Sequence, residues 1–411
     1  MQGLVTFVWF RQDSSRVLKL GKTAIAAAMF LLCFSSAVLA ADTQPPPNPL
    51  EITTPDPLLP SSSLKQPLTS QERLQLKAAL DQLNAQATAQ LQASNPAAAY
   101  EIWHRELRLR RVLGSLEEVE ALGRVGGIAW QDNQKAEVKL ITGRLQAIQQ
   151  QAQPTADLAL LQALGQAYQQ VRVPRPALEV YQQILTSARQ GQDRATQGAT
   201  LKTIADLHMS WFDYPKAAVT YEELLSMAQA QRDSVNEVVY LRQLAHIYDQ
   251  AKQPQNSLRV KQQLAQSYLN NKELDKLPAL KIAIASDYEA LNQPNEASLN
   301  YQAAYKQAWS LQHFAFASEA LQKLAALYYS HNQPDSALRI YQALLEAKQQ
   351  SYDYYGLMNT YDQIAQIYLQ RRDFAQALAA FQKGLDIAQS LQYQQSYFAN
   401  QIEQVTQQSS Q

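Results

Sequence analysis

Cysteine is almost absent from this chain of 411 residues, which contains Cys33 alone. A single thiol can form neither an internal disulfide nor a cluster of thiolate metal ligands. Cys33 lies in an N-terminal segment that we expect to be removed, and Leu32 stands before it where a lipoprotein has a small residue, so we expect no lipidation. The mature chain therefore has no thiol for disulfide, metal or nucleophilic chemistry.

An excess of one charge is lacking as well, since 36 Lys and Arg residues balance 36 Asp and Glu residues. Removal of residues 1–40 takes away four basic residues and one acidic residue, which leaves 32 basic against 35 acidic and a net charge of −3. Nucleic-acid binding needs a clustered basic excess, so we predict no nucleic-acid partner. Glycine is scarce, at 12 residues, and the many Ala, Leu and Gln residues favour helices over sheets.

One long apolar run occurs, at residues 24–39, after a segment that contains Arg11, Arg16, Lys19 and Lys22. Basic residues, an apolar run and Val38-Leu39-Ala40 as a cleavage site are typical of a Sec-type export signal. The run is shorter than the ~20 residues of a comfortable membrane span. We predict residues 1–40 as a signal peptide and a periplasmic or lumenal location. The alternative is an uncleaved anchor at residues 24–40, which would be the protein's membrane contact.

Residues 41–67 contain eight of the chain's 17 prolines, together with three consecutive serines. Such a composition favours extended polyproline geometry. We predict a Pro-rich linker that buries no core and spaces the folded part from the export site.

An aromatic ring recurs every 40 residues between positions 168 and 368, with histidine in place of tyrosine once. A small residue stands three places before each ring, and an aliphatic residue stands four places before it. A fixed period of this length predicts a solenoid of helical hairpins, none of which folds alone. The six ring positions are Tyr168, His208, Tyr248, Tyr288, Tyr328 and Tyr368.

Each repeat predicts two helices joined by a short turn. In the first, helix A, the spacing i, i+3, i+6, i+7 places Leu161, Leu164 and Tyr168 on one face. Helix B carries a small residue and an aromatic residue four places later, such as Ala177 and Tyr181. Prolines mark the first turn of helix B, where their missing N–H costs nothing. These prolines are Pro174, Pro254, Pro294 and Pro334.

This pattern resembles the tetratricopeptide repeat over residues 156–391. The scheme L-x-x-L-G-x-x-Y, then A-x-x-x-F/Y, is matched by Leu161 to Tyr168 and by Ala177 and Tyr181. The resemblance implies an all-α fold, a right-handed α-solenoid of helix-turn-helix hairpins, with six repeats in residues 151–391. The unit is 40 residues long rather than the usual 34. Ser257 and Lys261 depart from the small residue and the ring of the third helix B.

The flanking regions show the same unit in weaker form. We predict two divergent helical hairpins in residues 68–150, where Ala99 and Trp103 occupy helix B positions. The glycine-rich stretch 122–127 follows a helical pattern and no strand, which favours close helix packing over phosphate binding. Residues 392–411 are predicted as a capping helix and tail, because a solenoid must cover its last repeat.

The one basic cluster consists of Arg105, Arg108, Arg110 and Arg111. Five glutamates surround it in the sequence, so we predict a solvated, salt-bridged face, with a binding patch as the alternative.

Catalytic and metal-binding patterns are not found. The five histidines have no third ligand at metal spacing, and H-E-x-x-H, G-x-S-x-G and phosphate-cradling loops are missing. His208 occupies a ring position and is interpreted as a packed core residue, and His246 is expected to pair with Asp249 on one helix face. We therefore predict a non-enzyme with no cofactor and no metal.

Tetratricopeptide proteins bind partners along the groove formed by helix A, so the resemblance implies a partner site at the inward helix A positions. These positions are polar and of mixed charge, and soluble helix faces are the alternative interpretation. The predicted groove residues are Lys202, Asp206, Arg242, His246, Asp249, Glu289 and Tyr329.

These features together predict a non-catalytic scaffold or assembly factor of the cell envelope that binds a protein or an extended peptide in its groove. The alternative is a peptide or small-ligand receptor that acts by a change of superhelical conformation.

Overall fold

The computed structural model describes residues 48–51, 55–59, 67–152 and 157–410. The predicted signal peptide, residues 1–40, lies outside the described residues, as do residues 41–47, 52–54 and 60–66 of the predicted linker.

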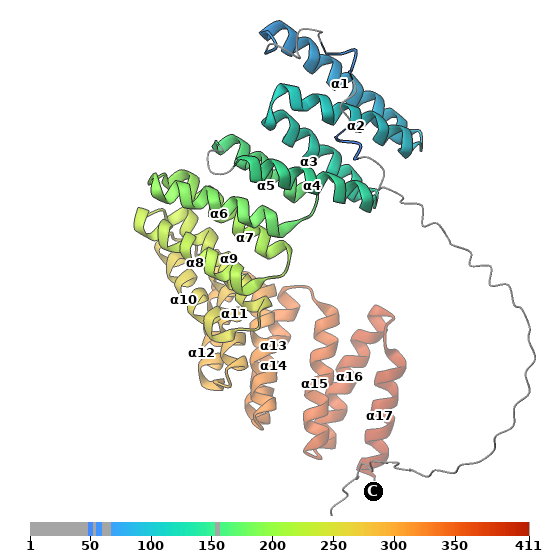
Figure 1. Ribbon diagram of the computed structural model, residues 1–411. Coiled ribbons are helices and arrows are strands. Elements are labelled where there is room, and N and C mark those ends of the chain that lie inside the picture. The colour runs from blue at the N-terminus through green and yellow to red at the C-terminus, as the bar shows by residue number, and fades with distance from the viewer. Residues whose placement is uncertain (1–47, 52–54, 60–66, 153–156, 411) are drawn as a thin grey trace, which may run out of the picture. The chain divides into compact units, whose positions relative to one another are not determined.

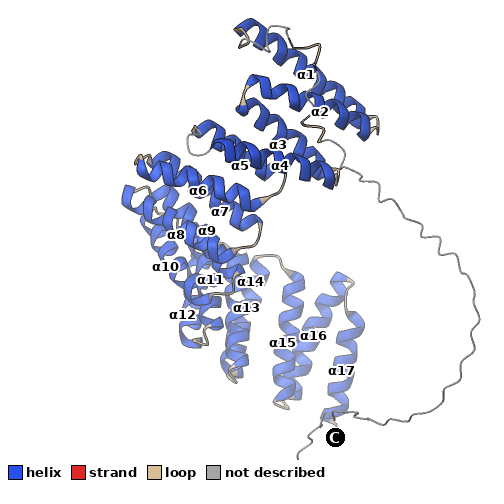
Figure 2. Ribbon diagram, viewed as in Figure 1, coloured by secondary structure: helices blue, strands red, loops and turns tan. Residues whose placement is uncertain are grey.

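All regular structure in the described residues is helical (Figure 2). Apart from the step between α4 and α5, each helix packs on the next along the chain. From α3 to α16 the odd-numbered helices form helix A and the even-numbered helices form helix B of successive hairpins (Figure 1). The all-α solenoid of hairpins predicted from the sequence is confirmed. The elements are α1 (Ser70–Gln92), α2 (Pro96–Leu113), α3 (Ser115–Gln131), α4 (Lys135–Ala152), α5 (Leu158–Gln170), α6 (Pro174–Gln190), α7 (Arg194–Ser210), α8 (Tyr214–Gln231), α9 (Ser234–Gln250), α10 (Pro254–Asn270), η1 (Leu274–Lys276), α11 (Leu277–Ala290), α12 (Pro294–Ser310), α13 (Phe314–Ser330), α14 (Pro334–Gln350), α15 (Tyr354–Gln370), α16 (Phe374–Leu391) and α17 (Gln395–Ser409).

The turns between helices repeat every 20 residues, which is half the sequence period. In each turn from the end of α5 onward, one residue adopts the left-handed conformation, with φ between 52° and 61°. At the end of α9, for example, the Lys252 N–H donates to the Asp249 carbonyl and the Gln253 N–H donates to the Tyr248 carbonyl, which satisfies the last carbonyls of the helix. The left-handed residues are Arg172, Gln192, Phe212, Arg232, Lys252, Lys272, Asn292, Gln312, Asn332, Tyr352, Arg372 and Gln392.

The core consists of the predicted repeat positions. Leu164, Leu244 and Leu324 of helix A are buried, and so are the helix B rings Tyr181 and Tyr301. Prolines begin α6, α10, α12 and α14 as the sequence predicted. After the last repeat, α17 buries Phe398 and Val405 against α16.

The third helix B departs from this apolar pattern. Lys261 occupies the ring position with 5% of its surface exposed, and its ammonium lies 2.9 Å from Asp249 and 3.0 Å from Asp287. The Ser257 hydroxyl oxygen lies 2.6 Å from the Asp249 carboxylate and 3.0 Å from the Asp287 carboxylate, and its one proton can be donated to either. A buried ionic cluster therefore replaces the ring in this repeat.

The prediction that residues 41–67 bury no core is wrong for the part that is described. Leu50 is 1% exposed and belongs to the main hydrophobic core. Arg105 of α2 holds both carboxylate oxygens of Asp56, at 2.7 and 2.9 Å, and Arg108 donates to the Pro49 carbonyl at 2.6 Å. Arginine side chains thus supply hydrogen bonds that a proline-rich segment cannot make within itself.

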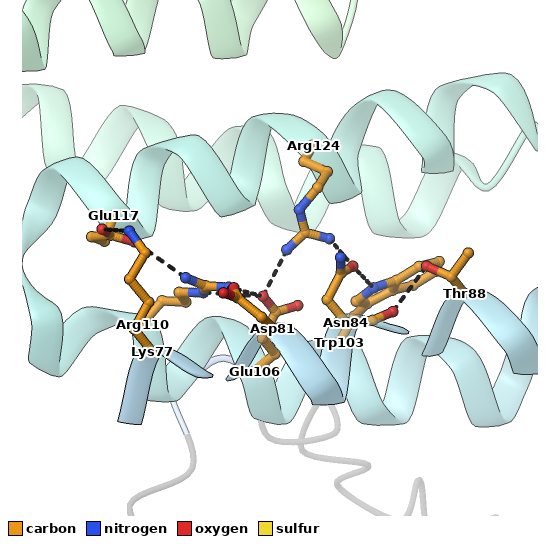
Figure 3. Close-up of polar contacts among 9 residues, drawn as sticks. All are labelled: Lys77, Asp81, Asn84, Thr88, Trp103, Glu106, Arg110, Glu117 and Arg124. Carbon is orange, nitrogen blue, oxygen red and sulfur yellow. Dashed lines mark hydrogen bonds and ion pairs between the residues drawn. The ribbon is translucent and has the colours of Figure 1, made fainter. Parts of the chain in front are cut away.

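The basic cluster is salt-bridged, as predicted, but it is not solvated throughout. Arg110 is 6% exposed and lies among Asp81 at 2.5 Å, Glu106 at 3.0 Å and Glu117 at 3.1 Å. Figure 3 shows these side chains from α1, α2 and α3 meeting in one polar network, in which Arg124 also bonds the buried Glu106 at 2.7 Å. The network ties the divergent N-terminal helices together.

Within the described ranges, no helix combines the length and the hydropathy of a membrane span.

Candidate functional site: a groove on helices α5 and α7

Two adjoining cavities lie along helices α5, α6 and α7. One has a volume of about 670 Å³ and the other of about 450 Å³, and they share Gln166, Tyr181 and Thr203 as lining residues. Gln162 of α5 borders the smaller cavity, and Asp206 of α7 borders the larger one. The two cavities therefore form one groove along polar positions of helix A, which we call the α5–α7 groove.

The groove residues are held by side chains that reach across from helix B. Gln169 donates to the Tyr181 hydroxyl at 2.7 Å, and the Tyr221 hydroxyl donates to Asp206 at 2.9 Å. Asp206 also pairs with Lys202 at 2.7 Å. Burial, followed by the bond to Asp206, raises the pKa of Tyr221 far above its ordinary value, so this hydroxyl remains a donor.

The same arrangement recurs in later repeats. Lys261 of α10 donates to Asp249, and Tyr301 of α12 donates to Glu289. Three of the predicted groove residues, Asp206, Asp249 and Glu289, are thus bonded by the residue at the helix B ring position of the same repeat. The orientation of each of these three carboxylates is thus fixed by a hydrogen bond within its own repeat.

The remaining predicted groove residues are spread along the array. Arg242 and His246 are exposed on α9, and Tyr329 of α13 is 39% exposed and donates to Gln370 of α15 at 2.7 Å. The expected pair of His246 and Asp249 does not form, and Asp249 is bonded to Ser257 and Lys261.

Two tryptophans and an arginine at the groove were not predicted as site residues. Trp130 at the end of α3 is 47% exposed, and Trp211 at the end of α7 is 51% exposed. Both border the larger cavity, and the Arg172 guanidinium lies over the Trp130 ring at 5.1 Å. The sequence signal for the two tryptophans is a large aromatic residue that comes directly after the repeated apolar positions of a helix A.

The predicted core role of His208 is confirmed. Only 11% of its side chain is exposed, and burial lowers its pKa, which keeps it neutral at pH 7. Among the described residues, no group of three or more His, Cys, Asp or Glu side chains is placed to hold a metal ion.

Residues 316–390 match the family model of the tetratricopeptide repeat. The hairpins α5–α6 to α11–α12, which precede this segment, keep the same 40-residue period. This segment of the chain therefore consists of tetratricopeptide repeats. No curated protein sequence matches this chain.

Several solved structures share features of the fold. BtubC (BKLC) from P. vanneervenii is 23% identical over 53% of this chain and 92% of its own, with a TM-score of 0.38. The STAND protein with a tetratricopeptide-repeat sensor from Pyrococcus horikoshii is 12% identical over 85% of this chain and 50% of its own, with a TM-score of 0.41. The apo form of the quorum sensor NprR from B. thuringiensis is 14% identical over 71% of this chain and 80% of its own, with a TM-score of 0.35. These TM-scores are too low to support an argument about function.

Proposed function

We propose that this tetratricopeptide-repeat protein is a non-catalytic interaction scaffold that binds an extended segment of a partner protein in the α5–α7 groove. The observation that carries the proposal is the groove itself, a continuous hollow bordered by Gln162, Gln166 and Asp206, with half-exposed tryptophan at its rim.

The chemistry of the groove suits a peptide backbone. A glutamine side chain both donates and accepts hydrogen bonds, so Gln162 and Gln166 can bond the N–H and C=O groups of an extended chain. Exposed indole rings such as that of Trp211 supply the large apolar contact area of binding hot spots. Asp206, fixed by Tyr221 and Lys202, offers an oriented acceptor to the same segment.

We further propose that the scaffold works in the cell envelope, on the basis of the export signal that the sequence predicts at residues 1–40. N-terminal sequencing of the protein recovered from the envelope fraction tests this location. A chain that begins at Ala41 is expected, whereas an intact leader on a cytoplasmic protein would contradict it.

Site-specific photocrosslinking tests the groove. A benzoylphenylalanine at position 166 in the native cell is expected to crosslink one defined partner. The matched control places the same probe at position 219, because Val219 is 71% exposed on α8 and borders neither cavity of the groove. Equal crosslinking from both positions would contradict the proposal.

The crosslinked segment of the partner is then made as a fluorescent peptide. We expect Trp211→Ala to weaken its binding at least about tenfold, as loss of an aromatic hot-spot residue does. The control is Phe212→Ala, which removes a neighbouring ring that is 74% exposed and does not border the groove.

A further inference from the structure

Helix α5 packs on α3 rather than on α4, and this displacement leaves one face of α4 uncovered. Elsewhere helix B packs on the next helix A, as α6 does on α7 and α8 on α9. The close approach of α3 and α5 depends on glycine, because a Cβ at Gly126 would lie 2.1 Å from Val171 and a Cβ at Gly123 would lie 2.9 Å from the backbone of Ala167. The glycine-rich stretch at residues 122–127, which was predicted to allow close helix packing, thus lies where α5 packs on the preceding helix A instead of on the preceding helix B.

The uncovered face of α4 forms the floor of a separate cavity of about 630 Å³. The Trp130 ring, Val138 and Val173 supply apolar walls, and Lys135 and Lys139 stand on the same face of α4 one turn apart. The volume lies within the range of about 300–1,000 Å³ that small-molecule sites occupy.

The two lysines of this cavity have no acidic partner among the described residues. Glu137, which lies between them in sequence, is bonded instead to His104 at 2.7 Å. Lys135 is also the first residue of α4, where the positive end of the helix dipole disfavours a cation. The other even-numbered helices begin with Pro, Tyr or Phe. A bound anion would therefore relieve an unfavourable arrangement of charge at this position.

Gly143 of α4 shows that the cavity has room. A Cβ added at Gly143, which lines the cavity, would meet no atom within 4 Å, although glycine inside a helix is destabilising relative to alanine.

We propose that this cavity binds a small organic anion with an apolar or aromatic body. Lys135 and Lys139 bind the acidic group, Trp130 and Val138 contact the body, and Gly143 keeps the floor open. The site is distinct from the α5–α7 groove, and the proposal does not depend on the function assigned to that groove.

The probe for the test is 8-anilino-1-naphthalenesulfonate, an aromatic sulfonate, whose fluorescence is titrated with the purified protein. Gly143→Leu fills the cavity from a position with no neighbouring atom, so the fold is retained, and we expect binding at least about tenfold weaker. The matched control is Gly198→Leu in α7, where an added Cβ also meets no atom within 4 Å and which borders neither this cavity nor the α5–α7 groove. This control is expected to bind the probe as the unmodified protein does.

A second pair of measurements tests the charge requirement. The variant Lys135→Gln/Lys139→Gln is expected to bind the sulfonate about tenfold more weakly and to bind the uncharged N-phenyl-1-naphthylamine within about twofold of the unmodified protein. Dodecanoate is expected to displace the sulfonate, and dodecanol is expected to displace it much less. Unchanged sulfonate binding in Gly143→Leu, or equal loss of both probes in the lysine variant, would overturn the proposal.

Discussion

Lys261 and Asp287 form an ion pair of 3.0 Å inside the repeat array, at two positions that other repeats fill with apolar residues. Lys261 replaces the helix B ring, and Asp287 replaces the aliphatic or small residue found at Ala167, Leu207 and Ile247. Two polar departures in separate repeats thus satisfy each other, and Asp249 and Ser257 complete the cluster.

Loss of the lysine alone is expected to be costly. Lys261→Met leaves Asp287 buried without its cation, and removing one partner of a buried pair costs about 3–5 kcal/mol. Urea unfolding measures the free energy. The control Lys202→Met removes the lysine of an exposed pair, for which we expect a change of at most about 1 kcal/mol.

Restoring the apolar pattern of the other repeats is expected to reverse the loss. The variant Lys261→Tyr/Asp287→Leu removes both charged groups at once. Replacement of a buried ion pair by apolar residues is often neutral, or stabilising by about 1–4 kcal/mol. A double variant that unfolds as easily as Lys261→Met would contradict this expectation. It would show that the ion pair stabilises the fold more than an apolar pair at positions 261 and 287 does.

Burial of Asp287 is expected to make stability depend on pH in a direction opposite to that of an ordinary ion-paired carboxylate. Burial raises the pKa of Asp287, although Lys261 and Ser257 act to lower it. As the pH rises above about 3.9, the Asp287 carboxyl therefore loses its proton in the unfolded chain before it does so in the folded protein. The free energy of unfolding falls between the unfolded and the folded pKa of Asp287. Above the folded pKa the loss in stability stays constant.

The measurement is the unfolding free energy of the unmodified protein minus that of Asp287→Asn between about pH 3 and about pH 7. We expect this difference to fall as the pH rises. A difference that rises would mean that Lys261 holds the pKa of the carboxyl below its ordinary value.

Two glycines of one hairpin are expected to respond in opposite ways to alanine. Gly143→Ala should stabilise the protein by about 0.5–1 kcal/mol, because it removes a helix-interior glycine where space is open. Gly126→Ala should destabilise it by about 1–3 kcal/mol, because the new Cβ would overlap Val171 between α3 and α5. Thermal unfolding followed by circular dichroism distinguishes the two, and similar shifts would contradict the close packing of α3 on α5.

Leu50 tests whether the proline-rich segment belongs to the folded unit. A linker residue would tolerate truncation, whereas Leu50→Ala is expected to cost about 2–5 kcal/mol, because its side chain is 1% exposed. Leu74→Ala is the control, since Leu74 is 70% exposed on α1 and should change stability by at most about 0.5 kcal/mol.

The hairpins could be predicted because their positions repeat, and prolines marked the start of α6, α10, α12 and α14. The helix ends before the turns could not be predicted in the same way. From the end of α5 onward each turn contains a left-handed Gln, Asn, Lys, Arg, Phe or Tyr rather than a left-handed glycine, so the usual marker of a helix end is missing there.

The repeat register singled out Asp206, which borders the larger cavity of the α5–α7 groove. It did not single out Trp130 and Trp211, because they lie just outside the repeated helix A positions. Leu50 was missed for another reason. Its burial depends on Arg105, Arg108 and Arg111, which are far away in sequence, and glutamates near those arginines suggested a surface cluster.

Trp130 and Val173 border both the α5–α7 groove and the cavity on α4. The two hollows therefore have the Trp130 and Val173 side chains in common. An occupant that moves the Trp130 indole on one side reshapes the site on the other. Because linked equilibria are reciprocal, a small anion that strengthens peptide binding by some factor must itself be bound more tightly, by the same factor, once the peptide is in place.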